Sequence, residues 1–176
     1  MSEIISQKEI QQLKEWTSLK FRNIIFNSDV DDWSESTSVF NQRIIGKKQL
    51  SFLIEDDDNE VFGYYLNTEV KEIHDIQIGT DDKTFEFNLQ SKNNRLPNPM
   101  KFEIMHTYDG GCVFRSEEDD MLIVLGEICL NKENTKNDSS CCDENNFNKH
   151  KIKKALCGKR YGERFTPKRI VVIQMK

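Results

Sequence analysis

The sequence predicts an α+β fold in which two antiparallel β-sheets pack as a sandwich and short helices flank them. Three observations support this fold class. Short segments with strand-like apolar patterns recur between residues 50 and 130 and again near the C-terminus, clusters of Asn, Asp, Gly and Pro separate them, and helical patterns lie toward the two ends of the chain. Strands that follow one another with little helix between them favour antiparallel pairing.

Two helices are expected before the main run of strands. Ser6 and Glu9 have the spacing of a capping box, and apolar residues follow them at helical intervals, which predicts a helix over about 7–17. An Asp-x-x-Glu cap with an apolar pattern behind it predicts a second helix over about 33–45, which ends at a glycine. The segment 21–26 between them fits either a strand or the end of a short helix.

The strand pattern begins with a hairpin. Apolar-rich segments at 50–54 and 61–66 flank the acidic run 55–60, which we expect to be a solvated turn. This run lacks the glycine and glutamate positions of a calcium loop, so no bound metal is expected there. The polar stretch 131–146 predicts an exposed loop. Further strands are expected at 84–89, 100–104, 112–114, 122–125, 128–130 and 170–173.

Length and composition predict one domain. The chain has 176 residues, of which 36% are apolar, enough for a single core. Within it we distinguish an N-terminal helix at 1–18 from the sandwich at 19–176. No stretch reaches the roughly 18 apolar residues of a membrane span, and the first residues carry charges throughout. We therefore expect no membrane insertion, and a cytoplasmic or nuclear rather than a secreted protein.

Five cysteines, two of them adjacent, fit neither a disulfide framework nor paired metal ligands. Reduced thiols and no cofactor are expected. Cys157 has the most favourable electrostatic surroundings for a reactive thiol, because lysines and an arginine lie close to it in the sequence. The nearest linear set for nucleophilic catalysis is His106, Asp109 and Cys112, but the Gly-Gly pair within it is typical of a hairpin. No catalytic residue is assigned.

Charge is distributed unevenly along the chain. Residues 149–176 contain ten Lys and Arg against one acid, a net charge of +9, whereas residues 1–148 sum to −14. The basic segment predicts a short helix with one cationic face, which either contacts a phosphate or another anionic partner or neutralises acidic loops of the same domain. The candidate contact residues are Lys149, Lys151, Lys153, Lys154, Lys159 and Arg160.

The hairpin also carries a resemblance to a known family. Its strands read Leu50-Ser51-Phe52-Leu53-Ile54 and Val61-Phe62-Gly63-Tyr64, and Phe85-Glu86-Phe87-Asn88-Leu89 follows, with Cys142 to Phe147 and Phe165 to Met175 later in the chain. This order resembles the TLDc domain of oxidation-resistance proteins over about residues 19–176. The sequence departs from that pattern at the family's glycine-rich run, reduced to Gly126, and in the last strand, where Val171 replaces an acid.

The resemblance implies a sandwich without established enzymatic chemistry. Family members are associated with protection against oxidative damage and, in several cases, with binding and regulating the vacuolar proton-pumping ATPase. A protein-binding domain in the stress response is therefore our first functional hypothesis. Nucleic-acid binding through residues 149–169 is the second, and a thiol-dependent enzyme is the third.

The most specific part of the resemblance is the pair Phe62 and Gly63. Glycine inside a strand weakens it, so this glycine is expected where no Cβ fits. We expect Phe62 to be a core residue.

Overall fold

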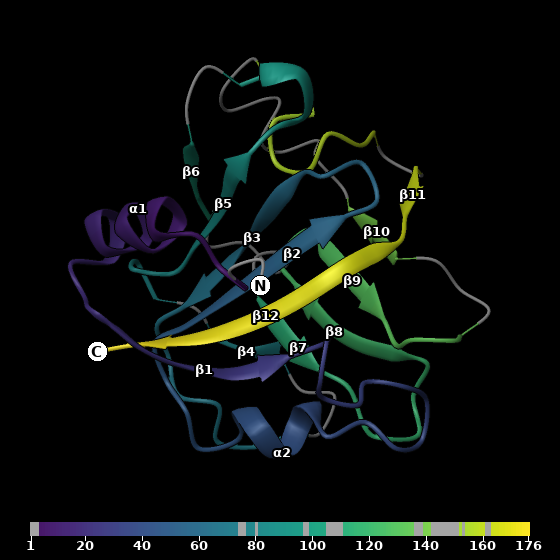
Figure 1. Cartoon of the computed structure of the whole chain (residues 1–176). Coiled ribbons are helices and arrows are strands. Elements are labelled where there is room, and N and C mark those ends of the chain that lie inside the picture. Colours follow the sequence, from purple (N-terminus) through teal and green to yellow (C-terminus); the bar gives the residue numbers. More distant parts are fainter. Residues whose placement is uncertain are drawn as a thin grey trace.

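A computed structural model describes residues 4–73, 77–79, 81–96, 99–104, 111–135, 139–141, 152, 154–160 and 163–176. Within these residues the chain forms two six-stranded antiparallel sheets, and α1 (Gln7–Thr17) packs on the outer side of one of them (Figure 1). The α+β sandwich expected from the sequence is therefore confirmed.

We name the two sheets A and B. Sheet A has the order β1-β12-β2-β3-β5-β6, and sheet B has the order β11-β10-β9-β8-β7-β4. The strands of sheet A are β1 (Phe21–Asn27), β12 (Pro167–Met175), β2 (Leu50–Asp56), β3 (Val61–Leu66), β5 (Phe85–Gln90) and β6 (Met100–Glu103). The strands of sheet B are β11 (Arg164–Phe165), β10 (Ser139–Cys141), β9 (Ile128–Asn131), β8 (Met121–Leu125), β7 (Cys112–Phe114) and β4 (Gln77–Ile78).

The strands expected from the apolar patterns are all present, with ends shifted by a few residues. The segment 21–26, which fitted a strand or a helix, belongs to β1. Strands β4, β10 and β11 were not expected. Since β10 lies inside 131–146, the expectation of a loop throughout that stretch is wrong at Ser139–Cys141.

The first expected helix is confirmed with its cap. The Ser6 hydroxyl accepts a hydrogen bond from the Glu9 N–H at 3.2 Å, and the Glu9 carboxylate accepts one from the Ser6 N–H at 2.7 Å. Leu13 is fully buried, and Trp16 packs against Phe85 of β5 with ring centroids 6.0 Å apart. This helix thus covers part of the outer side of sheet A with its apolar face.

The expected helix at 33–45 is wrong over most of its length. Only α2 (Phe40–Ile44) is helical. The Asp32 carboxylate accepts hydrogen bonds from both the N–H and the hydroxyl of Ser34, and Ser36 has a positive φ of 68°. Such local side-chain bonds give the backbone an alternative to the helix, so the apparent cap closes a turn instead.

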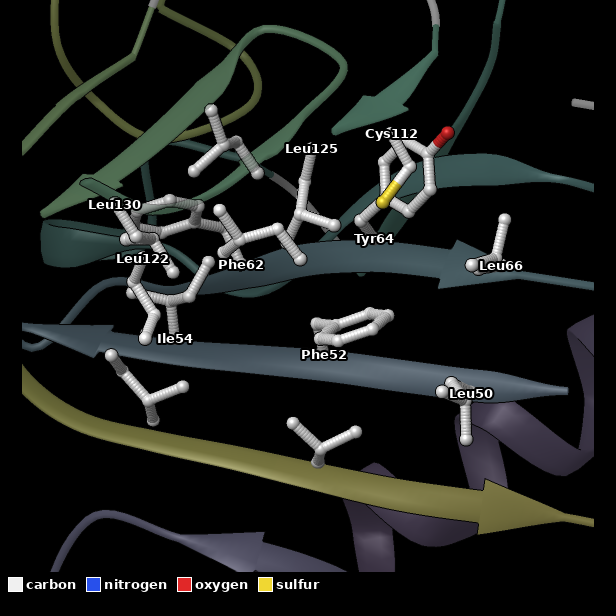
Figure 2. Packing of buried hydrophobic residues seen from close by; sticks show 14 of the residues in the cluster. Leu50, Phe52, Ile54, Phe62, Tyr64, Leu66, Cys112, Leu122, Leu125 and Leu130 are labelled. Atoms are coloured by element: carbon white, nitrogen blue, oxygen red, sulfur yellow. The ribbon is translucent and has the colours of Figure 1, made fainter. Parts of the chain in front are cut away.

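The main core lies between the two sheets. Alternate side chains of β2 and β3, among them Phe52 and Phe62, point toward leucines of sheet B, and Figure 2 shows this packing from close by. Phe62 is fully buried and stacks edge-on against Phe165 at 5.4 Å between ring centroids. The expectation that Phe62 is a core residue is confirmed.

Gly63 lies at a close approach between strands of sheet A. A Cβ at this position would lie 2.9 Å from the Phe52 carbonyl carbon and 2.9 Å from Cζ of Phe87, and closer still to the Phe52 carbonyl oxygen. Real Cβ atoms essentially never approach other atoms so closely, so the expectation that no Cβ fits is confirmed.

Candidate interaction surface

The acidic turn of the β2–β3 hairpin is exposed at Asp57 and Asn59, as expected, but the expectation of a solvated turn is wrong at Asp56 and Glu60. Asp56 is fully buried and Glu60 is 2% exposed. One oxygen of the Asp56 carboxylate accepts hydrogen bonds from the N–H groups of Asp58 and Glu60, each at 2.9 Å. The turn is therefore closed around its own buried carboxylate, which requires a counter-charge from elsewhere in the chain.

Lys159 supplies this counter-charge. Its side chain is 9% exposed, and its Nζ lies 2.9 Å from Asp56 Oδ2 and 2.7 Å from Asp58 Oδ2. Burial lowers the pKa of Lys159, but the bonds to the two carboxylates outweigh it and leave the pKa above its ordinary value. Hydrogen bonds from Lys159 and Lys92 in turn lower the pKa of Asp58 to about 2.

Glu60 forms the second half of this network. Its carboxylate accepts bonds from Arg95 Nη2 at 2.8 Å, from Asn88 Nδ2 at 3.1 Å and from the N–H of Lys92 at 2.8 Å. The same Asn88 amide donates to the Leu156 carbonyl at 2.8 Å. We call Asp56, Asp58, Glu60, Asn88, Lys92, Arg95 and Lys159 the hairpin network. Through Lys159 and the bond from Asn88, it attaches the segment 154–160 to the hairpin. Ala155, Leu156 and Cys157 of this segment also lie in the core between the sheets.

Two of the candidate contact residues in the basic segment thus pair with carboxylates of the same domain. Lys159 is buried in the hairpin network, and Lys154 forms an ion pair with Glu163 at 3.2 Å. Arg160 is exposed, and Lys149, Lys151 and Lys153 lie outside the described residues. The expected helix is wrong over 154–160, which forms a turn beginning with a positive φ of 58° at Lys154.

The expectation that Cys157 is a reactive thiol is also wrong. Cys157 is fully buried and disulfide-bonded, so the expectation of reduced cysteines fails at this position. Its neighbours in the core place the side chain inside the molecule, so the basic residues close to it in the sequence do not make it a reactive thiol. Cys112 is free but fully buried, and burial raises the pKa of its thiol well above the ordinary value. His106 and Asp109 lie outside the described residues.

An open groove of about 610 Å³ adjoins the hairpin network. It lies among the first turns of α1, the tip of the β2–β3 hairpin, and the segment that leaves β5 through the short 3-10 turn η1 (Lys92–Asn94). We call it the α1 groove. It is lined by Ser6, Lys8, Glu9, Gln12, Asp58, Asn59, Leu89, Gln90, Ser91, Lys92, Asn93, Asn94, Leu96 and Pro99.

The α1 groove has an unusual backbone and an amide-rich surface. Three of its asparagines, Asn59, Asn93 and Asn94, have positive φ values of 61°, 54° and 50°. Asparagine tolerates this left-handed region better than most residues, and non-glycine residues in it are typical of turns and functional sites. No local sequence pattern predicts this groove, because the three elements that form it are far apart in the sequence.

The comparisons with known proteins give the family. A model of the TLDc domain matches residues 1–148. This match includes α1 and ends before the segment 154–160 and β12. None of the curated proteins matches the chain. In the described parts of the chain, no helix is long and apolar enough to cross a membrane. Because the family model covers most of its length, the chain belongs to the TLDc domain family.

Proposed function

We propose that this TLDc domain protein is a non-enzymatic interaction domain that acts in protection against oxidative damage by binding another protein. The vacuolar proton-pumping ATPase is the partner class that its family membership suggests. The proposed site of action is the cytoplasm or nucleus, as the sequence predicts.

The ionisation and bonding of the carboxylates in the α1 groove are the main support for a non-enzymatic function. Asp58 is ionised down to about pH 2, because Lys159 and Lys92 hold its carboxylate. A general acid or base works best with a pKa near the operating pH, so Asp58 is poorly suited to proton transfer. Glu9 is engaged in the capping box of α1. These carboxylates serve the fold, which favours recognition over chemistry at this surface.

The cysteine side chains also favour a non-enzymatic function. Reaction with peroxide requires an accessible thiolate with a depressed pKa. Cys112 is buried with a raised pKa, and Cys157 is buried and already disulfide-bonded. Direct scavenging of peroxide by either residue is thus disfavoured. The nucleic-acid alternative is weakened too, since Lys154 and Lys159 already pair with carboxylates of the same domain.

Two measurements on the purified chain test the proposal. We expect saturable binding to immobilised, purified vacuolar proton-pumping ATPase in biolayer interferometry, and no consumption of hydrogen peroxide above the buffer rate. Bovine serum albumin on the same surface is the control for non-specific binding. Robust peroxide turnover that disappears in a Cys112→Ser or Cys157→Ser variant would overturn the non-enzymatic mechanism. Absence of binding would overturn the partner class.

A further inference from the structure

Four cationic side chains gather at one end of sheet A. The end of β12 lies beside the beginning of β1 (Figure 1), and it pairs on its other side with the beginning of β2. The N–H of Lys20 donates to the Lys176 carbonyl at 2.7 Å, and the N–H of Lys176 donates back to Lys20 at 2.8 Å. Arg22 Nη1 donates to Gln174 Oε1, and Gln174 Nε2 donates to the Lys48 carbonyl, each at 3.3 Å. We call Lys20, Arg22, Lys48 and Lys176 the cationic patch.

The charges of the cationic patch are not neutralised within the described part of the domain. All four side chains are exposed, and none of them forms an ion pair with a described residue. Four cations less a free carboxylate at Lys176 leave a net charge of +3. Neighbouring segments contribute Lys14 and Lys47, which balance Glu15 and Glu69. Charges farther than about 8 Å away are largely screened at physiological ionic strength, so the patch dominates a contact made at this end of the sheet.

Exposed apolar side chains belong to the same segments. Among the described residues, four large apolar side chains are exposed, namely Ile4, Phe21, Val30 and Ile45. Phe21 is 37% exposed and stands between two members of the cationic patch in the sequence, and Ile45 is 46% exposed and precedes Lys48 by three residues. Cations beside exposed apolar side chains are typical of proteins that bind the surface of an anionic membrane.

This combination favours a lipid surface over a single small anion or a nucleic acid. The four cations come from three chain segments and are exposed, so they offer distributed charge rather than an enclosed site for one phosphate. Proteins that bind single-stranded nucleic acids stack bases on aromatic side chains, and the aliphatic Ile45 offers no such platform. In a lipid headgroup region, by contrast, both Phe21 and Ile45 leave water while the cations remain near anionic groups.

We propose that the cationic patch, together with Phe21 and Ile45, docks the protein reversibly on the surface of an anionic membrane. The cations contact the anionic headgroups, and the two apolar side chains enter the headgroup region. The contact is peripheral and involves no membrane-spanning segment. This inference goes beyond the proposed function and does not depend on which protein is the partner.

Co-sedimentation of the full-length chain with lipid vesicles tests the inference. We expect binding to phosphatidylcholine vesicles that contain about 30% phosphatidylserine, and no binding to pure phosphatidylcholine. Binding should weaken as NaCl rises from about 50 mM to about 500 mM. The double variant Lys20→Glu with Lys48→Glu should lower the partition coefficient at least about tenfold, because two attractive charges become repulsive.

Lys8→Glu with Arg164→Glu is the matched control for charge. Both residues are exposed and form no ion pair with a described residue. Lys8 lies beside the tip of the β2–β3 hairpin and Arg164 shortly before β12 begins, so both are at the opposite end of sheet A. This variant has the same net charge as the test variant and should bind vesicles as the wild type does.

Phe21→Ser tests the apolar part of the contact. We expect it to lower the partition coefficient about fivefold, because a partly exposed aromatic side chain no longer leaves water on binding. Val30→Ser is the matched control, since Val30 is 81% exposed but follows the other end of β1. Melting temperatures close to that of the wild type confirm that each variant is folded.

Four results would overturn the inference. They are no binding to phosphatidylserine vesicles at low salt, equal binding with and without phosphatidylserine, equal losses in the two charge-reversal variants, and unchanged binding of Phe21→Ser. Tighter binding to a single-stranded oligonucleotide than to the vesicles, lost in Lys20→Glu with Lys48→Glu, would also overturn it by making the patch a nucleic-acid site. Binding to the proton pump is measured separately, so its absence leaves these outcomes unchanged.

Discussion

Replacement of Gly63 by alanine tests the close approach at the centre of sheet A. The added Cβ would lie 2.9 Å from the Phe52 carbonyl carbon and from Cζ of Phe87. Ordinary contacts begin near 3.4 Å, so both neighbours must move by about 0.5 Å, and the Phe52 carbonyl oxygen must move further. The Phe87 contact is made by its ring, but the Phe52 contacts are made by backbone atoms of β2, which pairs with β3, so the Phe52 carbonyl cannot shift without disturbing strand pairing.

We expect Gly63→Ala to lower the free energy of unfolding by about 3 kcal/mol, the upper end of the usual range for overpacking, because a backbone group is among the clashing atoms. For a chain of this size, that loss corresponds to a fall of about 6–12 °C in the melting temperature. Circular dichroism melts of wild type and variant measure it.

Gly79→Ala is the matched control for this substitution. No atom of the described residues lies within 4 Å of a Cβ at Gly79, and its φ is not in the left-handed region. The control should melt at or slightly above the wild-type temperature, because alanine restricts the unfolded chain more than glycine does. A Gly63→Ala protein that melts within about 2 °C of the wild type, a loss of no more than about 1 kcal/mol, would refute the reasoning.

Three further outcomes are expected. Phe62→Ala should lower the free energy of unfolding by about 3–5 kcal/mol in urea titrations, because it leaves a cavity in the main core. Lys159→Met should lower it by about 3–5 kcal/mol, because it leaves the Asp56 carboxylate buried without its cation, whereas Lys168→Met at an exposed ion pair should lower it by about 1 kcal/mol or less. The pKa of Asp58 is lowered on folding from 3.8 to about 2, so its contribution to stability is full above pH 4 and is lost as the pH falls toward 2. Asp58→Asn should flatten the fall in melting temperature over that interval, and an unchanged profile would contradict the assignment.

The strands could be predicted from the sequence because each is specified by its own residues. Alternation in a half-buried strand and apolar runs in a fully buried one need no information from elsewhere. The capping box of α1 is equally local, since Ser6 and Glu9 bond to each other. The expected helix at 33–45 fails because Asp32 has two local bonding options, and the turn through Ser34 prevails over the helix cap.

The hairpin network could not be predicted from local pattern, because its partners are distant in sequence. Lys159 pairs with carboxylates that lie far before it in the sequence. Arg95, which follows β5, pairs with Glu60, which precedes β3. The one sequence signal for it is the charge asymmetry between residues 1–148 and 149–176, which favours pairing between the two parts but names no partners. The α1 groove could not be predicted for the same reason, because the elements that form it are far apart in the sequence.

The position of β12 has a consequence for how sheet A folds. This strand follows all the other strands of the sheet in the sequence, yet it lies between β1 and β2, with Met175 opposite Phe21 and Ile170 opposite Ile54. Among the described strands, β12 is the one neighbour of β1, so β1 joins the sheet only when β12 is in place. Completion of the sheet therefore depends on contacts of long sequence separation, which form slowly. Until they form, the facing edges of β1 and β2 are both open, and a chain in that state is prone to aggregation.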